Sequence, residues 1–200
     1  MYGMAIVRIS PMKIEGRWRS GVALDLHTTS STPIGYNEFG HMQFDTVRPE
    51  IAELLYRLKN HADRNAAGPI IETAADFLSR HRDKFNAIVP VPPSHQRALQ
   101  PVIVLAEGIG RALEVPVLAC ITATRSTKQL KNIIDPEERK KHVEGLYELD
   151  ARQTRGLKIL LFDDLFRSGT TMNAITDILI DPGQASVVRA LTITRTRSNH

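Results

Sequence analysis

The sequence has 200 residues but only one cysteine, Cys120, and it lacks a long apolar run. A single cysteine excludes an internal disulfide bond, argues against a cysteine-based zinc site and favours a reducing compartment. A membrane-spanning helix needs about 20 consecutive apolar residues, and no stretch approaches that length. The first ten residues also lack the apolar core of a signal peptide. We therefore expect a cytoplasmic protein without a membrane partner.

A strong charge of one sign is also absent. The chain carries 26 Lys and Arg residues against 22 Asp and Glu residues, which gives a formal net charge of +4. This modest excess favours an anionic ligand such as a polyphosphate. There is no basic stripe with interleaved aromatic residues, so nucleic acid is not expected as a partner and stays a weaker alternative. Paired His or Cys spacing is missing too, so a metal site built on such side chains is not expected.

The most informative stretch, residues 158–172, reads KILLFDDLFRSGTTM. Residues 159–162 form a short apolar run, which is typical of a strand buried on both faces of a parallel sheet. Asp163 and Asp164 follow, where this strand is expected to end. A loop of small residues comes next, and then a helical pattern of apolar residues: Met172, Ile175, Ile178 and Leu179.

This order of elements suits a ligand that carries a phosphate. The N-terminus of a helix offers unpaired backbone N–H groups and the positive end of the helix dipole. Gly169 permits close backbone approach, and the hydroxyls of Ser168, Thr170 and Thr171 add donors. Two adjacent carboxylates repel a phosphate but suit vicinal hydroxyls or a cation. The implied ligand has a phosphate at one end and a diol or a cation nearby.

Two other interpretations compete with this one. The acid pair could belong to a Walker B element of an ATPase, but the sequence contains neither GxxxxGKS nor GxxxxGKT. Asp164 could also be a turn residue, and Ser168 or Thr170 a helix cap, without any ligand. Each of these residues alone is more often structural. Their combination in this order, after a buried strand, favours the ligand site.

A second stretch, residues 86–97, has the same organisation. Residues 88–91 predict a strand that ends at Pro92, and a helix is expected to begin at Pro101. A polar loop lies between them and contains Ser94, His95, Gln96 and Arg97. A strand, a basic loop and a helix in this order form an anion site at the carboxyl edge of a sheet. His95 is expected to serve as a loop residue or phosphate donor, because no partner for metal binding is found.

Residues 46–200 predict an α/β fold with a parallel sheet flanked by helices. Further helices are expected from Pro49 and from about Gly68. Further strands are expected over residues 114–122 and 186–194.

Two segments of this part are polar. Lys59 and Arg64 fall in the loop between the first two helices, where cations are usually solvated but can also reach an anionic ligand. Residues 124–145 are charged, with a short helix expected over residues 136–142. Residues 1–45 differ from the rest, because residues 22–28 alternate between apolar and polar and turn formers follow. We expect a small antiparallel β element there, with residues 22–28 as a half-exposed strand.

Residues 158–172 resemble the signature with which type I phosphoribosyltransferases bind phosphoribosyl pyrophosphate (PRPP). The resemblance implies that Asp163 and Asp164 bind the 2- and 3-hydroxyls of the ribose and act in catalysis. It assigns the 5-phosphate of PRPP to Arg167, Ser168, Gly169, Thr170 and Thr171. Arg167 departs from the family pattern, in which Thr is commoner at this position.

The loop at residues 94–97 is similar to the family's pyrophosphate loop, and the PVP before it is similar to the ComF-type, competence-associated branch. The run after Arg97 departs from the Arg-Gly-Phe-Asn-Gln-like run of that branch. Residues 128–141 correspond to the flexible loop that closes over PRPP and excludes water. Arg139 matches the branch pattern there and is the third candidate catalytic residue. The other cations implied to neutralise the leaving pyrophosphate are Lys128, Lys131 and Lys140.

The resemblance implies transfer of phosphoribose from PRPP to an unidentified nitrogenous base, with release of pyrophosphate. Mg²⁺ would arrive with PRPP, since it commonly uses substrate phosphates as ligands. Residues 1–45 would form a hood over the active site; an edge sheet or a dimer contact is an equal alternative, and homodimers are common in the family. The alternative function is a PRPP-binding sensor, or a competence and DNA-uptake accessory protein, without transferase activity.

Overall fold

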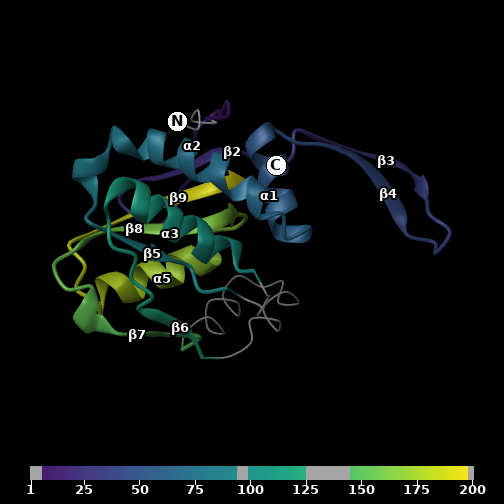
Figure 1. Ribbon diagram of the computed structural model, residues 1–200. Helices are drawn as coiled ribbons and strands as arrows, with labels where there is room; N and C mark the ends of the chain where they lie inside the picture. Colours follow the sequence, from purple (N-terminus) through teal and green to yellow (C-terminus); the bar gives the residue numbers. More distant parts are fainter. Residues whose placement is uncertain (1–5, 94–98, 125–144, 198–200) are drawn as a thin grey trace.

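The computed structural model describes residues 6–93, 99–124 and 145–197. Its centre is a five-stranded sheet in the order β1-β2-β9-β8-β5 (Figure 1). The strands are β1 (Met12–Lys13), β2 (Gly21–Leu26), β5 (Ala87–Pro90), β8 (Lys158–Phe166) and β9 (Val187–Arg195). The last four run parallel, and β1 pairs antiparallel with β2 at the edge. The predicted parallel sheet flanked by helices is confirmed.

Helices cover both faces of this sheet (Figure 1). On one face lie α1 (Glu50–Asn60), α2 (Ala67–Ser79) and α3 (Pro101–Leu113), and on the other lies α5 (Thr170–Ile180). Because side chains alternate along a strand, β8 contributes side chains to the hydrophobic cores on both faces of the sheet. Leu160 and Phe162 pack with the first three helices, whereas Ile159 and Leu161 pack with α5. This double burial explains the uninterrupted apolar run of β8.

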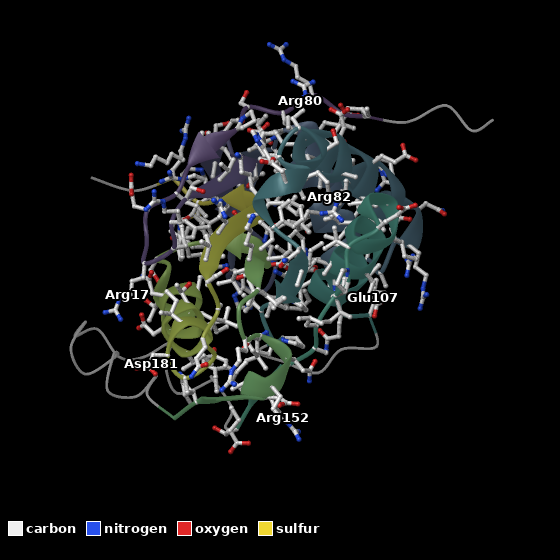
Figure 2. All side chains as sticks on the ribbon, turned by 90° about the vertical axis from the view of Figure 1, so that its left-hand side faces the viewer. Arg17, Arg80, Arg82, Glu107, Arg152 and Asp181 are labelled. Carbon is white, nitrogen blue, oxygen red and sulfur yellow. The ribbon has the colours of Figure 1, made fainter. Side chains whose placement is uncertain are left out.

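Prolines mark helix starts as the sequence predicts. Pro101 occupies the first turn of α3, and Pro49 is the residue just before α1. The described residues also include short 3₁₀ segments at Arg64–Ala66, Arg82–Lys84 and Ala151–Gln153. Side chains such as Arg80 and Arg152 point away from the body of the molecule (Figure 2). In the described ranges, no helix has the length and apolarity needed to cross a membrane.

The prediction for residues 22–28 is confirmed in part, because β2 pairs antiparallel with β1, but it was wrong about exposure and missed the parallel partner. A strand is present there as β2, but it is largely buried and pairs parallel with β9 inside the main sheet. The antiparallel element follows it as a hairpin of β3 (Ser30–Tyr36) and β4 (Met42–Val47). This hairpin projects from the body (Figure 1), and every residue of β3 is exposed.

The strand predicted over residues 114–122 was also wrong in most of its length. Only one parallel bridge forms there, between Val117 and Ile88. The Pro116 carbonyl and the Leu118 N–H bond the backbone of Ile88, at 2.9 and 2.8 Å. The chain then continues into β6 (Ile121–Ala123), which pairs antiparallel with β7 (Tyr147–Leu149). The helix predicted over residues 136–142 lies outside the described residues.

Candidate functional site

The acid pair lies inside a strand and not at its end, which corrects the prediction. β8 continues through Asp163 and Asp164 to Phe166, because β9 pairs with it as far as Arg195. On its other side β5 ends at Pro90, opposite Phe162. In the part of the chain that the structure describes, the last residues of β8 therefore have a neighbouring strand on one side only. Within the described residues, Asp163 and Asp164 therefore lie just beyond the end of β5.

The pleat of β8 directs the two carboxylates toward opposite faces of the sheet. Asp164 lies on the face of α1, where Lys59 Nζ is 3.0 and 2.9 Å from its two carboxylate oxygens. The side chains are only 13% and 28% exposed, respectively. Such a pair is partly shielded from water, so it matters more than a surface ion pair. Lys59 belongs to the last turn of α1 and not to the polar loop predicted from the sequence.

Asp163 lies on the face of α5. Its Oδ1 accepts a hydrogen bond of 2.8 Å from the Asp164 N–H. Burial and, to a smaller degree, the charge of Asp164 raise the pKa of Asp163 far above its usual range, against the opposing effects of that N–H and of Lys59. Thr192, in register with Asp163 on β9, has a buried hydroxyl without a hydrogen-bond partner in the described ranges. Hydroxyl donors from a ligand would stabilise the ionised form of Asp163.

The loop after β8 is shaped for an anion. Gly169 has φ +72°, and a Cβ at this position would lie 3.0 Å from the ring of Phe166. Ser168 Oγ and Thr170 Oγ1 are 3.0 Å apart, so the two hydroxyls converge. The helix α5 starts at Thr170 with no side-chain cap on its first N–H groups. These donors and the helix dipole are chemically suited to an anion, and the assignment of a phosphate to this loop stays a prediction.

Two contacts hold this loop in place from outside. Trp18 packs edge-to-face on Phe166, with ring centroids 6.1 Å apart. Thr171 hydrogen-bonds the hydroxyl of Tyr147 on β7, and burial is the main cause that raises the pKa of Tyr147. The loop is thereby fixed between the N-terminal segment and the β6–β7 pair.

His27 lies at the same edge of the sheet, directly after β2. Its backbone N–H donates to the Arg195 carbonyl at 2.7 Å, and its Nδ1 is 3.2 Å from Thr194 Oγ1. Burial, followed by the charges of Arg48, Lys59 and Arg167, lowers the pKa of His27, while Asp164 opposes them. The imidazole is therefore neutral at pH 7.

The structure brings together the acid pair and the loop that follows it, which were both singled out from the sequence. The reasoning from sequence missed Lys59 as a partner of Asp164, and it missed Tyr147 and His27 entirely. A correct prediction of β2 as a parallel strand would have placed His27 at the carboxyl edge. The remaining predicted residues lie outside the described residues: Ser94, His95, Gln96, Arg97, Lys128, Lys131, Arg139 and Lys140.

The donor set for a metal is small in the residues that the structure describes. No group of three or more His, Cys, Asp or Glu side chains is placed to hold an ion there. Asp163 and Asp164 remain as oxygen donors, and these suit a Mg²⁺ ion that keeps water and substrate phosphates as its other ligands.

The comparisons with known proteins include a curated relative at low identity. No family model matches the chain. Competence protein ComFC of Bacillus subtilis is 23% identical over 155 residues, which cover 75% of this chain and 62% of ComFC. The resemblance to the ComF-type branch is thus confirmed. The chain spans less than two thirds of the length of this relative.

Several solved structures are similar at a low level. Adenine phosphoribosyltransferase of Saccharomyces cerevisiae is 13% identical, with 83% of this chain and 82% of that chain covered and a TM-score of 0.47. The Trypanosoma brucei adenine phosphoribosyltransferase is 11% identical, with 94% and 75% covered and a TM-score of 0.48. The glutamine PRPP amidotransferase of B. subtilis is 16% identical, with 78% and 34% covered and a TM-score of 0.47.

Proposed function

We propose that this protein binds PRPP as its Mg²⁺ complex and transfers the phosphoribosyl group to a nitrogen atom of a base. In this reaction the bond from C1 to the pyrophosphate oxygen breaks, a bond from C1 to nitrogen forms, and the nitrogen loses its proton. The observation that carries the proposal is the acid pair just beyond the end of β5, followed directly by the start of α5, which has no side-chain cap among the described residues. This arrangement matches a diol and a phosphate on one ligand.

Each half of the ligand has a partner of suitable chemistry. The ribose hydroxyls would donate hydrogen bonds to Asp163 and Asp164. Burial raises the pKa of Asp163 because it disfavours the charged form, and hydrogen bonds from the ribose would stabilise that charged form. The 5-phosphate would sit against the loop 167–171, where hydroxyls and backbone N–H groups converge. Lys59 would hold the carboxylate of Asp164 in position.

Electrostatic stabilisation would carry most of the catalysis, because the ring develops positive charge as pyrophosphate leaves. Among the described residues, we assign the stabilisation of this positive charge to Asp163 and Asp164. We assign the orientation of pyrophosphate to Ser94, His95, Gln96 and Arg97. We assign its neutralisation during loop closure to Lys128, Lys131, Arg139 and Lys140.

A second candidate function is PRPP binding without transfer, in a sensor or an accessory protein. The relative ComFC, a competence protein, favours this candidate. It would use the same acid pair and phosphate loop but need no site for a base. Binding of PRPP alone therefore does not separate the two functions.

The formation of a nucleotide separates them. The wild-type protein would be incubated with Mg-PRPP and each of a panel of purine and pyrimidine bases, and both nucleotide and pyrophosphate would be measured. Equal amounts of nucleotide and pyrophosphate with one base, absent in the Asp163→Asn/Asp164→Asn variant, would support the transferase. Tight PRPP binding without product for any base would support the sensor.

A further inference from the structure

The root of the β3–β4 hairpin brings two side chains with recognition chemistry to the site edge. Thr29 closes this root, because its N–H and its Oγ1 both donate to the Val47 carbonyl, at 2.9 and 3.2 Å. His27 precedes this closure and Arg48 follows it. Their proximity is seen in the electrostatics, since Arg48 contributes the largest of the charge effects on His27.

Among the described residues, Arg48 has a side-chain donor without a hydrogen-bond partner. Its guanidinium lies 4.2 Å over the ring of Tyr56, and its NH1 is 3.5 Å from a carboxylate oxygen of Glu53. Its Nε is buried and has no hydrogen-bond partner in the described ranges. Buried donors in native proteins are nearly always satisfied, and a ligand is one usual explanation for an exception. The free N–H would suit a carbonyl oxygen.

His27 offers the complementary group. The Thr194 hydroxyl has one proton, which it donates to the Asp164 carbonyl at 3.4 Å, so the hydrogen bond from His27 Nδ1 to Thr194 Oγ1 requires a proton on Nδ1. The other ring nitrogen, Nε2, then carries a lone pair in the neutral imidazole. Charged groups from three elements surround the ring: Arg48 before α1, Lys59 on α1, and Asp164 and Arg167 on and after β8.

The strand order puts His27, which follows β2, on the side of β8 away from β5, and Arg48 lies close enough to His27 to affect its charge. In the order β2-β9-β8-β5, the strand that precedes the predicted pyrophosphate loop lies on one side of β8, and β2 lies on the other. A direct displacement at an anomeric carbon brings the nucleophile in on the face opposite to the leaving group. The acceptor base therefore approaches from the β2 side, where the hairpin begins and ends.

We propose that His27 and Arg48 bind the acceptor and select an oxo-base, in which a ring N–H stands beside a carbonyl group. Arg48 Nε–H donates to the carbonyl oxygen, and His27 Nε2 accepts from the ring N–H. An amino-base presents the reverse pattern, a ring nitrogen acceptor beside an amino donor, and leaves both protein groups unpaired. This assignment rests on the proposed function, because it needs the ribose at Asp163 and Asp164.

The binding of nucleotides, the products of the proposed reaction, tests this assignment without a measurement of the reaction rate. Ribose 5-phosphate would be titrated calorimetrically, followed by two matched pairs of nucleotides, IMP against AMP and UMP against CMP. Each pair differs only in the oxo or amino pattern of the base. We expect one oxo-nucleotide to bind at least tenfold tighter than its amino partner and than ribose 5-phosphate.

Four variants test whether His27 and Arg48 cause the preference for the oxo-nucleotide. His27→Ala and Arg48→Lys should each reduce the oxo preference to less than threefold while the affinity for ribose 5-phosphate stays unchanged. The matched controls are His41→Ala, at the exposed end of the same hairpin, and Arg80→Met, whose side chain points away from the body (Figure 2). Both controls should retain the wild-type preference.

The outcomes separate this inference from the proposed function. If ribose 5-phosphate binds but neither oxo-nucleotide is preferred, or if the preference survives in both His27→Ala and Arg48→Lys, the assignment of His27 and Arg48 is overturned and the PRPP site stands. If ribose 5-phosphate and PRPP both fail to bind the folded wild-type protein, the proposed function itself is wrong.

Discussion

Lys59 of α1 and Asp164 of β8 form an ion pair that joins the helical layer to the acid pair, with Nζ 2.9 Å from the nearer oxygen. These residues are far apart in the sequence, and the pair is only partly accessible to water. One carboxylate is therefore held by a fixed cation, whereas Asp163 has a raised pKa and, among the described residues, a hydrogen bond from a backbone N–H. The two acids thus have different environments, and this difference leads to separate predictions.

Lys59→Met should destabilise the protein, because it leaves Asp164 partly buried without its cation. We expect a loss of about 1–2 kcal/mol in the free energy of unfolding, between the values for exposed and for buried pairs. Urea unfolding at pH 7 measures it. The control is Arg57→Met in the same helix, which removes a more exposed pair with Asp63 and should cost less. An equal loss in both variants would contradict the special role of Lys59.

Asp163→Asn should stabilise the protein, and increasingly so as the pH rises. The pKa of Asp163 is higher in the folded than in the unfolded state, so below about pH 4 the side chain is protonated in both states and contributes no difference. Above that pH the unfolded state loses its proton first, and the wild type loses stability until Asp163 ionises in the folded state. We expect a gain of about 1–3 kcal/mol for the variant at neutral pH.

The measurement for Asp163→Asn is the free energy of unfolding from pH 3.5 to pH 8. The matched control is Asp76→Asn on the exposed side of α2, which should follow the wild type throughout. A variant that is less stable than the wild type at pH 7, or a difference that does not change with pH, would show that Asp163 is not strained by burial.

Gly169→Ala should weaken both the fold and phosphate binding. Its φ of +72° is unfavourable for residues with a Cβ, and the new methyl group would press on Phe166. A loss of about 1–2 kcal/mol in stability is expected, with weaker binding of inorganic phosphate. Gly68→Ala is the control, because a Cβ meets nothing within 4 Å in α2, and it should be neutral or slightly stabilising. Equal effects of the two substitutions would contradict the assignment.

The titration of His27 should depend on its charged neighbours. Its pKa is lowered by burial and by three cations and raised by Asp164. Asp164→Asn should therefore lower the pKa of His27 further, and Arg48→Met should raise it toward 6.5. NMR titration of the imidazole protons follows both shifts. A shift of either variant in the opposite direction would show that His27 does not face these groups.

The sequence predicted the elements whose signal is local. The apolar run of β8, Pro101 at the start of α3 and the small loop before α5 all lie within a few residues of the features that cause them. The sheet class followed from the order of strands and helices. The loop over residues 167–169 could be located for the same reason, and its assignment to phosphate stays a prediction.

Features that depend on distant pairing could not be predicted in this way. The alternation in residues 22–28 is compatible with an exposed hairpin, and only the partner β9 decides that β2 is a buried parallel strand. The position of the acid pair within β8 likewise depends on how far β9 extends. Lys59 looked like a loop cation, because the sequence does not show that α1 runs one turn further and ends over Asp164.

The most direct test of the account is a calorimetric titration of the wild type and of Asp163→Asn/Asp164→Asn with Mg-PRPP. Thermal unfolding of both proteins would establish that they are folded. We predict micromolar binding by the wild type and a loss of at least a hundredfold in the variant. Equal binding by both proteins, or no binding by the folded wild type, would contradict the claim that the acid pair of β8 holds the ribose of PRPP.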